Sequence, residues 1–143
     1  MEVKNYVLTF PTTGKTDLVD ITRDVAVRVR ESDIVEGSVL VFVPGSTAAL
    51  TTIEYEGGVI EDLKEAVARL APENLHYRHD ASWGDGNGYS HVRAALLGPS
   101  LTIPVIEGKL VLGTWQQVIL CDFDNRPRKR QVVVQVTGKS DRS

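Results

Sequence analysis

Apolar residues near the start of the chain form one strand-like run and one helix-like pattern. Residues 3–10 are rich in β-forming side chains and lead into a proline and a glycine, which predicts a strand followed by a turn. In the next segment apolar side chains recur every four residues, as on one face of a helix, and an aspartate before them is a suitable cap. The residues concerned are Asp20, Ile21, Val25 and Val29.

The middle of the chain repeats this succession of strand and helix. Residues 39–43, with the sequence VLVFV, are apolar throughout, as expected of a strand that is buried on both faces. A further strand is predicted over residues 47–55. Apolar side chains at helical spacing then predict a second helix, and the positions that carry this pattern are Ile60, Leu63, Val67 and Leu70.

The rest of the chain is predicted to be a loop, a short helix and a series of strands. Residues 75–89 lack an apolar period and contain three glycines, which indicates a loop, whereas residues 91–97 fit a short helix. The strands are predicted as a β-meander over 101–106, 110–112, 115–121 and 131–136. Because the helices and strands do not strictly alternate, we expect an α+β fold of mostly antiparallel strands with two to three helices. Residues 1–138 would form a single compact domain, and residues 139–143 a polar tail.

The composition narrows the class of protein to which this chain can belong. The chain has 143 residues, of which 42% are hydrophobic and 24% charged, as is usual for one globular domain. Its net charge of -3 argues against a nucleic-acid-binding protein, which usually carries a basic excess. No apolar run is long enough for a membrane helix and no signal peptide is evident, so we expect a cytoplasmic protein. The single cysteine, Cys121, lies in a predicted strand and is best interpreted as a buried structural thiol.

The three histidines are the strongest chemical clue. They are His76, His79 and His91, and the last two flank the glycine-rich loop, which could bring them face to face. Histidine binds metals and transfers protons near neutral pH. A metal site would need a further ligand, for which Glu54, Asp80, Asp85 or a water are candidates. His76 is more simply interpreted as a loop residue without a chemical role.

Two segments of the second half are also candidates for a binding site. Residues 113–116, Gly-Thr-Trp-Gln, interrupt a strand pattern, and a tryptophan followed by an amide could stack on and hydrogen-bond a heteroaromatic ring. The alternative is a core tryptophan with a cross-strand glutamine. Residues 126–130, Arg-Pro-Arg-Lys-Arg, could bind a phosphate or another anion, for which arginine is well suited. Their alternative interpretation is the charged end of a hairpin.

Taken together, the motifs resemble those of the YjbQ-like family, often described as the secondary thiamine-phosphate synthase type. The similarity spans nearly the whole chain and is strongest from His91 to Gln116. The segments that carry it are 41–43, 46–50, Glu54, 77–80, Asn87, 90–100, Pro104, 108–110, 113–116 and the 122–130 hairpin. Two positions depart from the family pattern: Gly45 stands where many relatives have a histidine, and Ile53 where many have an asparagine.

The resemblance implies a compact α+β fold, a homotrimer with sites near subunit boundaries, and a polar pocket centred on the two histidines. The same two histidines would hold a divalent metal such as zinc or magnesium. By residue match, the catalytic group would be Glu54, His79, His91 and Gln116. By the same match, the substrate would be bound by Thr47, Asn87, Thr114 and Arg128. Two further substrate-binding candidates are Arg93, as a cation for a diphosphate, and Trp115, which could stack on a pyrimidine ring.

Three functions follow from this reading. The first is a thiamine-phosphate synthase, which joins a thiazole phosphate to a pyrimidine methyl diphosphate and releases pyrophosphate. The second is metal-assisted hydrolysis of a phosphate ester, which needs only one substrate. The third is a trimeric protein that binds a metal or a small anionic metabolite without turnover. The partner in each case is a small phosphorylated metabolite or anion.

Overall fold

Two antiparallel sheets make up the framework in the computed structural model, which describes residues 1–141. The larger sheet has the strand order β1-β8-β3-β5-β6, and the smaller has the order β2-β7-β4. The strands are β1 (Glu2–Thr12), β2 (Asp17–Asp20), β3 (Ile34–Phe42), β4 (Ala48–Ile53), β5 (Ser100–Ile106), β6 (Lys109–Leu110), β7 (Gln117–Asp122) and β8 (Arg128–Ser140). The helices are α1 (Thr22–Ser32), α2 (Gly57–Leu70), α3 (Arg78–Trp83) and α4 (Gly88–Leu97).

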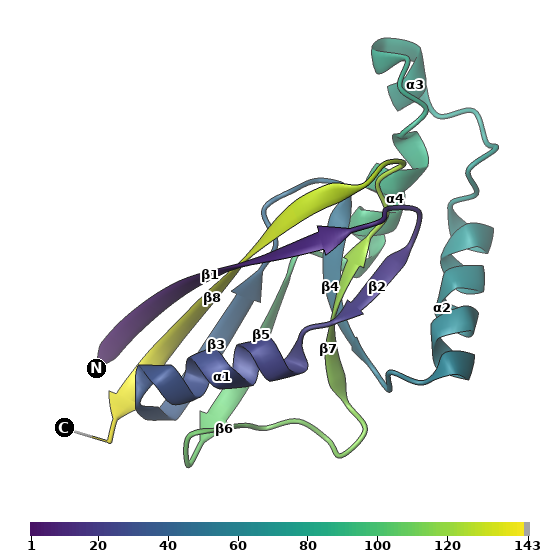
Figure 1. Cartoon of the computed structure of the whole chain (residues 1–143). Coiled ribbons are helices and arrows are strands. Elements are labelled where there is room, and N and C mark those ends of the chain that lie inside the picture. Colours follow the sequence, from purple (N-terminus) through teal and green to yellow (C-terminus); the bar gives the residue numbers. More distant parts are fainter. Residues whose placement is uncertain (142–143) are drawn as a thin grey trace.

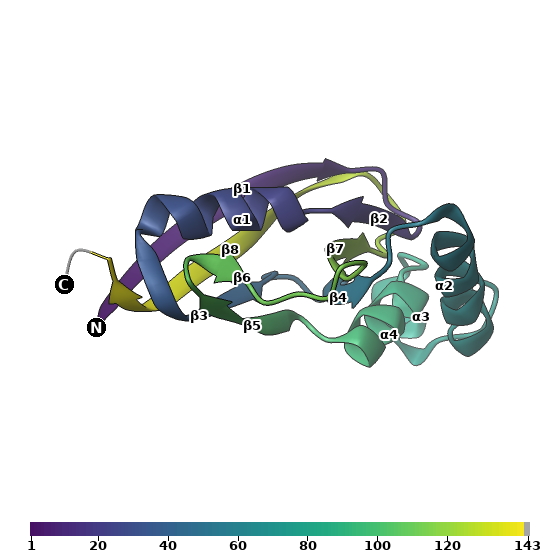
Figure 2. The same cartoon turned by 90° about the horizontal axis from the view of Figure 1, so that it is seen from below.

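The smaller sheet lies between the larger sheet and a group of helices. On one side of β7, Val118 and Leu120 join the core that also contains the inner face of the larger sheet and the buried side of α1. On the other side, Ile119 and Cys121 pack with residues of α2 and α4. Successive residues of a strand point to opposite faces, which explains why this part of β7 is apolar at every position. Figures 1 and 2 show α2, α3 and α4 gathered at one end of the molecule, with both termini near the other.

The α+β class and the antiparallel pairing predicted from the sequence are confirmed, and so is the first predicted hairpin, which is the β5–β6 pair. The rest of the predicted β-meander is wrong. β7 and β8 are consecutive in the chain and belong to different sheets. Residues 123–127 therefore connect the two sheets and do not close a hairpin. β8 pairs with β1 on one side and with β3 on the other. An alternating pattern identifies a strand but not its partner, which is why the sequence did not reveal this arrangement.

Two further boundaries differ from the prediction. Lys139 and Ser140 were expected in a polar tail. They are instead the last residues of β8 and pair with β3. Arg142 and Ser143, also assigned to the tail, lie outside the described residues. The predicted loop over 75–89 contains α3 and the first residues of α4. A helix of only six residues is too short to display a helical period.

Cys121 is a core residue, as its sequence context indicated. It is fully buried in β7, and burial raises the pKa of its thiol to about 12. The reactive form of cysteine is the thiolate, so this side chain is an inert apolar group near neutral pH.

No helix within residues 1–141 has both the length and the apolar character needed to cross a membrane.

Candidate functional site

A polar cavity of about 670 Å³ opens at the end of the molecule where α3 and α4 meet the connections between strands. Three segments supply its walls: the β3–β4 connection, the region from α3 into α4, and the β7–β8 connection with the start of β8. The lining residues are Gly45, Ser46, Thr47, His79, Trp83, Asp85, Asn87, His91, Asp124, Asn125, Arg126, Arg128 and Arg130.

Two histidines from different helices meet on one wall of this cavity. His79 belongs to α3 and His91 to α4, and their ring centroids are 4.2 Å apart. Burial lowers the pKa of His91, and the neighbouring His79 lowers it further. His91 is therefore neutral near pH 7, and a neutral imidazole can accept a proton.

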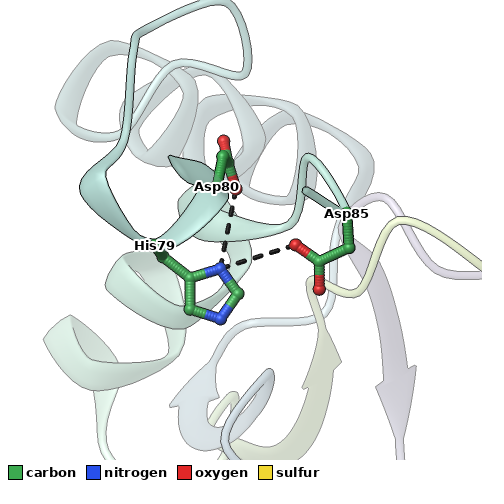
Figure 3. Close-up of side chains that lie close together, drawn as sticks. All are labelled: His79, Asp80 and Asp85. Atoms are coloured by element: carbon green, nitrogen blue, oxygen red, sulfur yellow. Dashed lines mark ion pairs between the residues drawn. The ribbon is translucent and has the colours of Figure 1, made fainter. Parts of the chain in front are cut away.

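Two carboxylates approach His79 from its own segment (Figure 3). Its Nδ1 atom lies 3.5 Å from an oxygen of Asp80 and 3.5 Å from an oxygen of Asp85. The same Nδ1 is buried and makes no hydrogen bond. Two atoms bound to one ion at about 2.1 Å and at the tetrahedral angle lie about 3.4 Å apart. The spacing and the unpartnered nitrogen therefore fit a metal ion held among these three side chains.

Backbone amides hold the two carboxylates in place. The amide of Gly88 donates to Asp80 over 2.8 Å, and that of Asn87 donates to Asp85 over 3.2 Å. Hydrogen bonds of this kind fix the orientation of ligand side chains. His91 stands beside this group and is not one of its three members.

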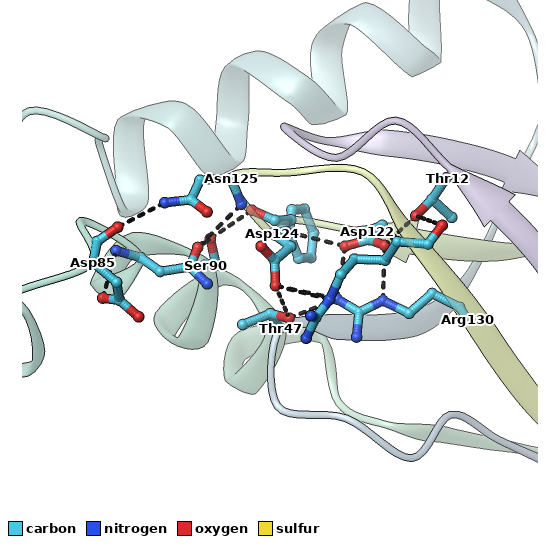
Figure 4. A network of polar contacts seen from close by, with 11 residues as sticks. Thr12, Thr47, Asp85, Ser90, Asp122, Asp124, Asn125 and Arg130 are labelled. Carbon is cyan, nitrogen blue, oxygen red and sulfur yellow. Dashed lines mark hydrogen bonds and ion pairs between the residues drawn. The ribbon is translucent and has the colours of Figure 1, made fainter. Parts of the chain in front are cut away.

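Arg130, which lines the cavity, forms a buried ion pair with Asp122 (Figure 4). Arg130 donates to both carboxylate oxygens of Asp122, over 2.7 and 2.9 Å, and to the hydroxyl of Thr47 over 2.6 Å. Burial alone would raise the pKa of Asp122, but the hydrogen bonds from Arg130 and Thr12 outweigh it and lower that pKa. Arg130 is thus an anchor between the two sheets, since its guanidinium is largely occupied by the protein itself.

Two other arginines are available to a ligand. Arg126 is exposed at the cavity, and the Arg128 side chain is 36% exposed, with its Nε 3.4 Å from Asp124. One guanidinium group can bind two phosphate oxygens through parallel hydrogen bonds. The part of the cavity lined by Arg126 and Arg128 is therefore suited to a phosphate or another anion.

Thr47 and Asn87, which were predicted to bind the substrate, line the cavity, and their polar atoms serve to position other residues. Thr47 donates to Asp124 over 2.9 Å while it accepts from Arg130. The side-chain oxygen Oδ1 of Asn87 accepts from the hydroxyl of Ser90 and, over 3.1 Å, from the backbone amide of Asn125. These bonds tie the start of α4 to the β7–β8 connection.

Four predicted site residues, namely Glu54, Thr114, Trp115 and Gln116, lie away from the cavity, at the other end of the smaller sheet. Thr47 and Asp122 lie at one end of the β4–β7 pair, whereas Glu54 and Gln116 flank the other end. Strands of six residues separate the two ends by about 20 Å. Gln116 donates to Thr52 over 3.1 Å. The residues involved, Glu54, Thr114, Trp115 and Gln116, are all exposed, and Trp115 is 70% exposed.

Arg93 does not contact the cavity, contrary to the prediction that it binds substrate. It is buried, donates to the carbonyl of Ala71 and the hydroxyl of Thr16 over 2.9 and 3.0 Å, and lies over the ring of Tyr89. Positions two apart on a helix point in very different directions, so His91 faces the cavity while Arg93 faces the interior.

The family model described as UPF0047 protein YjbQ-like matches residues 6–139. The chain belongs to this family. A UPF0047 protein of Archaeoglobus fulgidus is 42% identical over 127 residues, which cover 89% of this chain and 96% of that protein. A UPF0047 protein of Methanothermobacter thermautotrophicus is 38% identical over 139 residues, covering 97% of this chain and 95% of the relative.

Solved structures of YjbQ-like proteins share this fold. A crystal structure of a YbjQ-like protein of unknown function from Sulfolobus solfataricus matches with a TM-score of 0.87 and 34% identity, over 96% of this chain and 100% of that one. A YjbQ/UPF0047 family protein from Clostridium acetobutylicum matches with a TM-score of 0.85 and 33% identity, over 92% and 99%. Membership of the UPF0047 YjbQ-like family thus establishes the fold, and no specific activity follows from it.

Gly45, where a histidine is common in the YjbQ-like pattern, lies on the cavity wall. Its φ of 148° is one that residues with a side chain rarely adopt, and a Cβ there would lie 3.1 Å from Nη1 of Arg130. The glycine leaves this space open. Among the described residues, His79 and His91 are the only histidines that line the cavity.

Other lining residues were not singled out from the sequence. They are Ser46, Trp83, Asn125 and, most importantly, the buried Asp124. The signal for Asp124 was its position just after a buried strand and beside a basic run, where an acidic side chain has arginines within reach.

Proposed function

We propose that this protein binds a phosphorylated small metabolite together with a divalent cation and hydrolyses its phosphate ester. The observation that carries the proposal is the presence of a candidate cation site and of arginines in one cavity. His79 and Asp85 line it, with Asp80 next to His79, and Arg126 and Arg128 line it as well. A cation and arginines around a phosphate are the usual means of neutralising its charge.

The donor set indicates which cations suit the candidate cation site. Its members are one imidazole nitrogen and the carboxylate oxygens of Asp80 and Asp85. A mixed nitrogen and oxygen set is a common zinc environment, while the carboxylates also suit magnesium. A divalent cation supplies Lewis acidity to a phosphate ester.

The residues around the cation would carry out the remaining steps. Arg126 and Arg128 would bind the oxygens of the phosphate and hold it in the cavity. His91, which lies against His79 and is neutral near pH 7, would accept a proton from the attacking water as the water oxygen bonds to phosphorus. The ester P–O bond would break on the other side, and the departing alkoxide would take up this proton. Through their bonds to the β7–β8 connection, Thr47 and Asn87 would hold the β3–β4 connection and the start of α4 in place around the cavity.

The test of this function is phosphate release from a single substrate. The purified protein would be incubated with zinc, magnesium or manganese and either p-nitrophenyl phosphate or glycerol 3-phosphate. We expect phosphate release that requires the cation and stops when it is chelated. If cation and phosphate bind in a defined stoichiometry without any release, the protein is a binding protein and the hydrolase proposal is wrong.

Replacing His79 by alanine is expected to lower cation affinity by at least about tenfold, because it removes the nitrogen ligand from the set. His76→Ala is the matched control, since His76 is exposed and does not line the cavity. Metal content after dialysis and calorimetric titration with zinc would measure the effect. Equal affinities in both variants would exclude His79 as a ligand.

A second candidate is the thiamine-phosphate synthase reaction. A groove of about 390 Å³ shares Arg128 and Arg130 with the main cavity, so a ligand with more than one phosphate has room to extend along it. In this reaction Glu54, Thr114, Trp115 and Gln116 would have to come from a neighbouring copy in a homotrimer, and their exposure is compatible with that role. Pyrophosphate release that requires both a thiazole phosphate and a pyrimidine methyl diphosphate would favour this candidate over hydrolysis.

A further inference from the structure

Asp124 carries a buried carboxylate oxygen that has no partner among the described residues. The side chain is only 2% exposed, and it lines the cavity. Its Oδ2 accepts a hydrogen bond from Thr47 and lies 3.4 Å from Nε of Arg128 and 3.7 Å from Nη2 of Arg130. Its Oδ1 makes no hydrogen bond. Buried polar atoms are nearly always paired, so an unpaired one in a residue that lines a cavity indicates a group that a ligand satisfies.

The position of this oxygen restricts what the ligand presents to it. Figure 4 shows Asp124 within the network that joins Thr47 and Arg130 to Asn125. A carboxylate repels a phosphate, so Oδ1 is not a contact for the phosphate itself. An oxygen of this kind accepts a hydrogen bond, and its partner on the ligand must therefore be a donor.

The surrounding charges favour a neutral donor over a cationic one. The negative charge of Asp124 is already opposed by Arg128 and Arg130, and Arg126 lines the same cavity. An ammonium group would meet these guanidinium groups at close range, whereas a hydroxyl would not be repelled.

We infer that Oδ1 of Asp124 accepts a hydrogen bond from a hydroxyl group of the ligand. The substrate class is then a phosphate ester with a free hydroxyl close to its phosphate, as in a polyol or sugar phosphate. This inference rests on the proposed function, because it takes the phosphate to lie against Arg126 and Arg128. It adds a specificity residue, since an analogue without the hydroxyl leaves a buried carboxylate oxygen unpaired.

The experiment compares three small phosphates by calorimetric titration of the purified full-length chain. Methyl phosphate has no donor beyond its phosphate, glycerol 3-phosphate adds hydroxyls, and phosphoethanolamine adds an ammonium. We expect glycerol 3-phosphate to bind at least about tenfold more tightly than methyl phosphate. Equal binding of these two would overturn the inference. Tighter binding of phosphoethanolamine than of glycerol 3-phosphate would overturn the choice of a hydroxyl.

Two variants then assign the preference to the residue. In Asp124→Asn we expect the two affinities to become equal, while methyl phosphate binds at least as tightly as before because a negative charge has been removed from the pocket. Asp62→Asn, an equal change of charge on exposed α2, is expected to keep the wild-type preference. A preference that persists in Asp124→Asn would contradict the inference.

The comparison of phosphates on the wild-type chain needs no variant, so it remains decisive if Asp124→Asn does not fold. It also separates the two proposals. If none of the three phosphates binds, the proposed function fails and the inference fails with it. If methyl phosphate binds and glycerol 3-phosphate has no advantage, only the inference fails.

Discussion

Asp122→Ala is expected to lower the free energy of unfolding by about 3–5 kcal/mol, because it leaves a charged guanidinium buried without its partner. Arg130 is 6% exposed and Asp122 is fully buried, and the two are joined by two short hydrogen bonds. They lie where β7 ends and β8 begins, so the pair connects the two sheets. Urea unfolding at pH 7 would measure the loss.

A double variant separates the cost of an unpaired charge from the value of the pair. Asp122→Leu combined with Arg130→Met removes both charges, and we expect it to recover most of the lost stability, as often happens when a buried ion pair is replaced by apolar groups. If Asp122→Ala alone costs less than about 1 kcal/mol, the range typical of an exposed ion pair, Arg130 is not held in the way the structure shows.

The same pair makes stability depend on pH in acid. The folded-state pKa of Asp122 is lower than its ordinary value of 3.8. A lowered pKa means that the contribution of the carboxylate is fully present above the ordinary value and is lost as the pH falls through the lowered one. Wild-type stability should therefore fall below about pH 4, and Asp122→Leu/Arg130→Met should lose less over the same range.

His91→Ala should reduce the rate of phosphate release by about 10²–10⁴-fold, which is the usual contribution of a general base. Cation affinity should change little, since His91 is not among the three grouped ligands. The pH profile of kcat/KM provides the specific signature. The pKa of His91 is lowered and its neutral form would be the active one, so the rate should hold at neutral pH and fall as the pH drops through that lowered pKa.

The variant should lose this acidic limb of the profile along with most of the rate. His76→Ala is the control, and it should keep both. Retention of the full rate and the same acidic limb by His91→Ala would exclude the residue as the base. A large loss of cation affinity would instead assign His91 to the ligand set.

The sequence revealed those parts of the fold that have a period of their own. The positions Val25, Val29 and Val67 are buried on α1 and α2 as their spacing predicted. Strand partners depend on which faces are buried together across the whole molecule, and the local pattern does not record this. The pairing of β8 with β1 and β3, and the division into two sheets, were therefore beyond reach.

The candidate site was predictable to a similar degree. His79 and His91 could be found because histidine is rare in this chain and both lie near the glycine-rich segment. Arg93 was misplaced because its helical face depends on where α4 packs. Asp124 was overlooked because an acidic residue beside a basic run resembles a solvated surface. Its burial arises only when the two sheets meet.

The place of β8 has a consequence for the protein while it is being synthesised. Within residues 1–141, β8 is the only strand partner of β1, and it also carries Arg128 and Arg130. Residues 128–140 leave the ribosome after every other described strand and helix, so a growing chain exposes the edges of β1 and β3 until this last strand arrives. A nascent or prematurely terminated chain without β8 lacks Arg128 and Arg130 and leaves these strand edges unpaired, which favours aggregation.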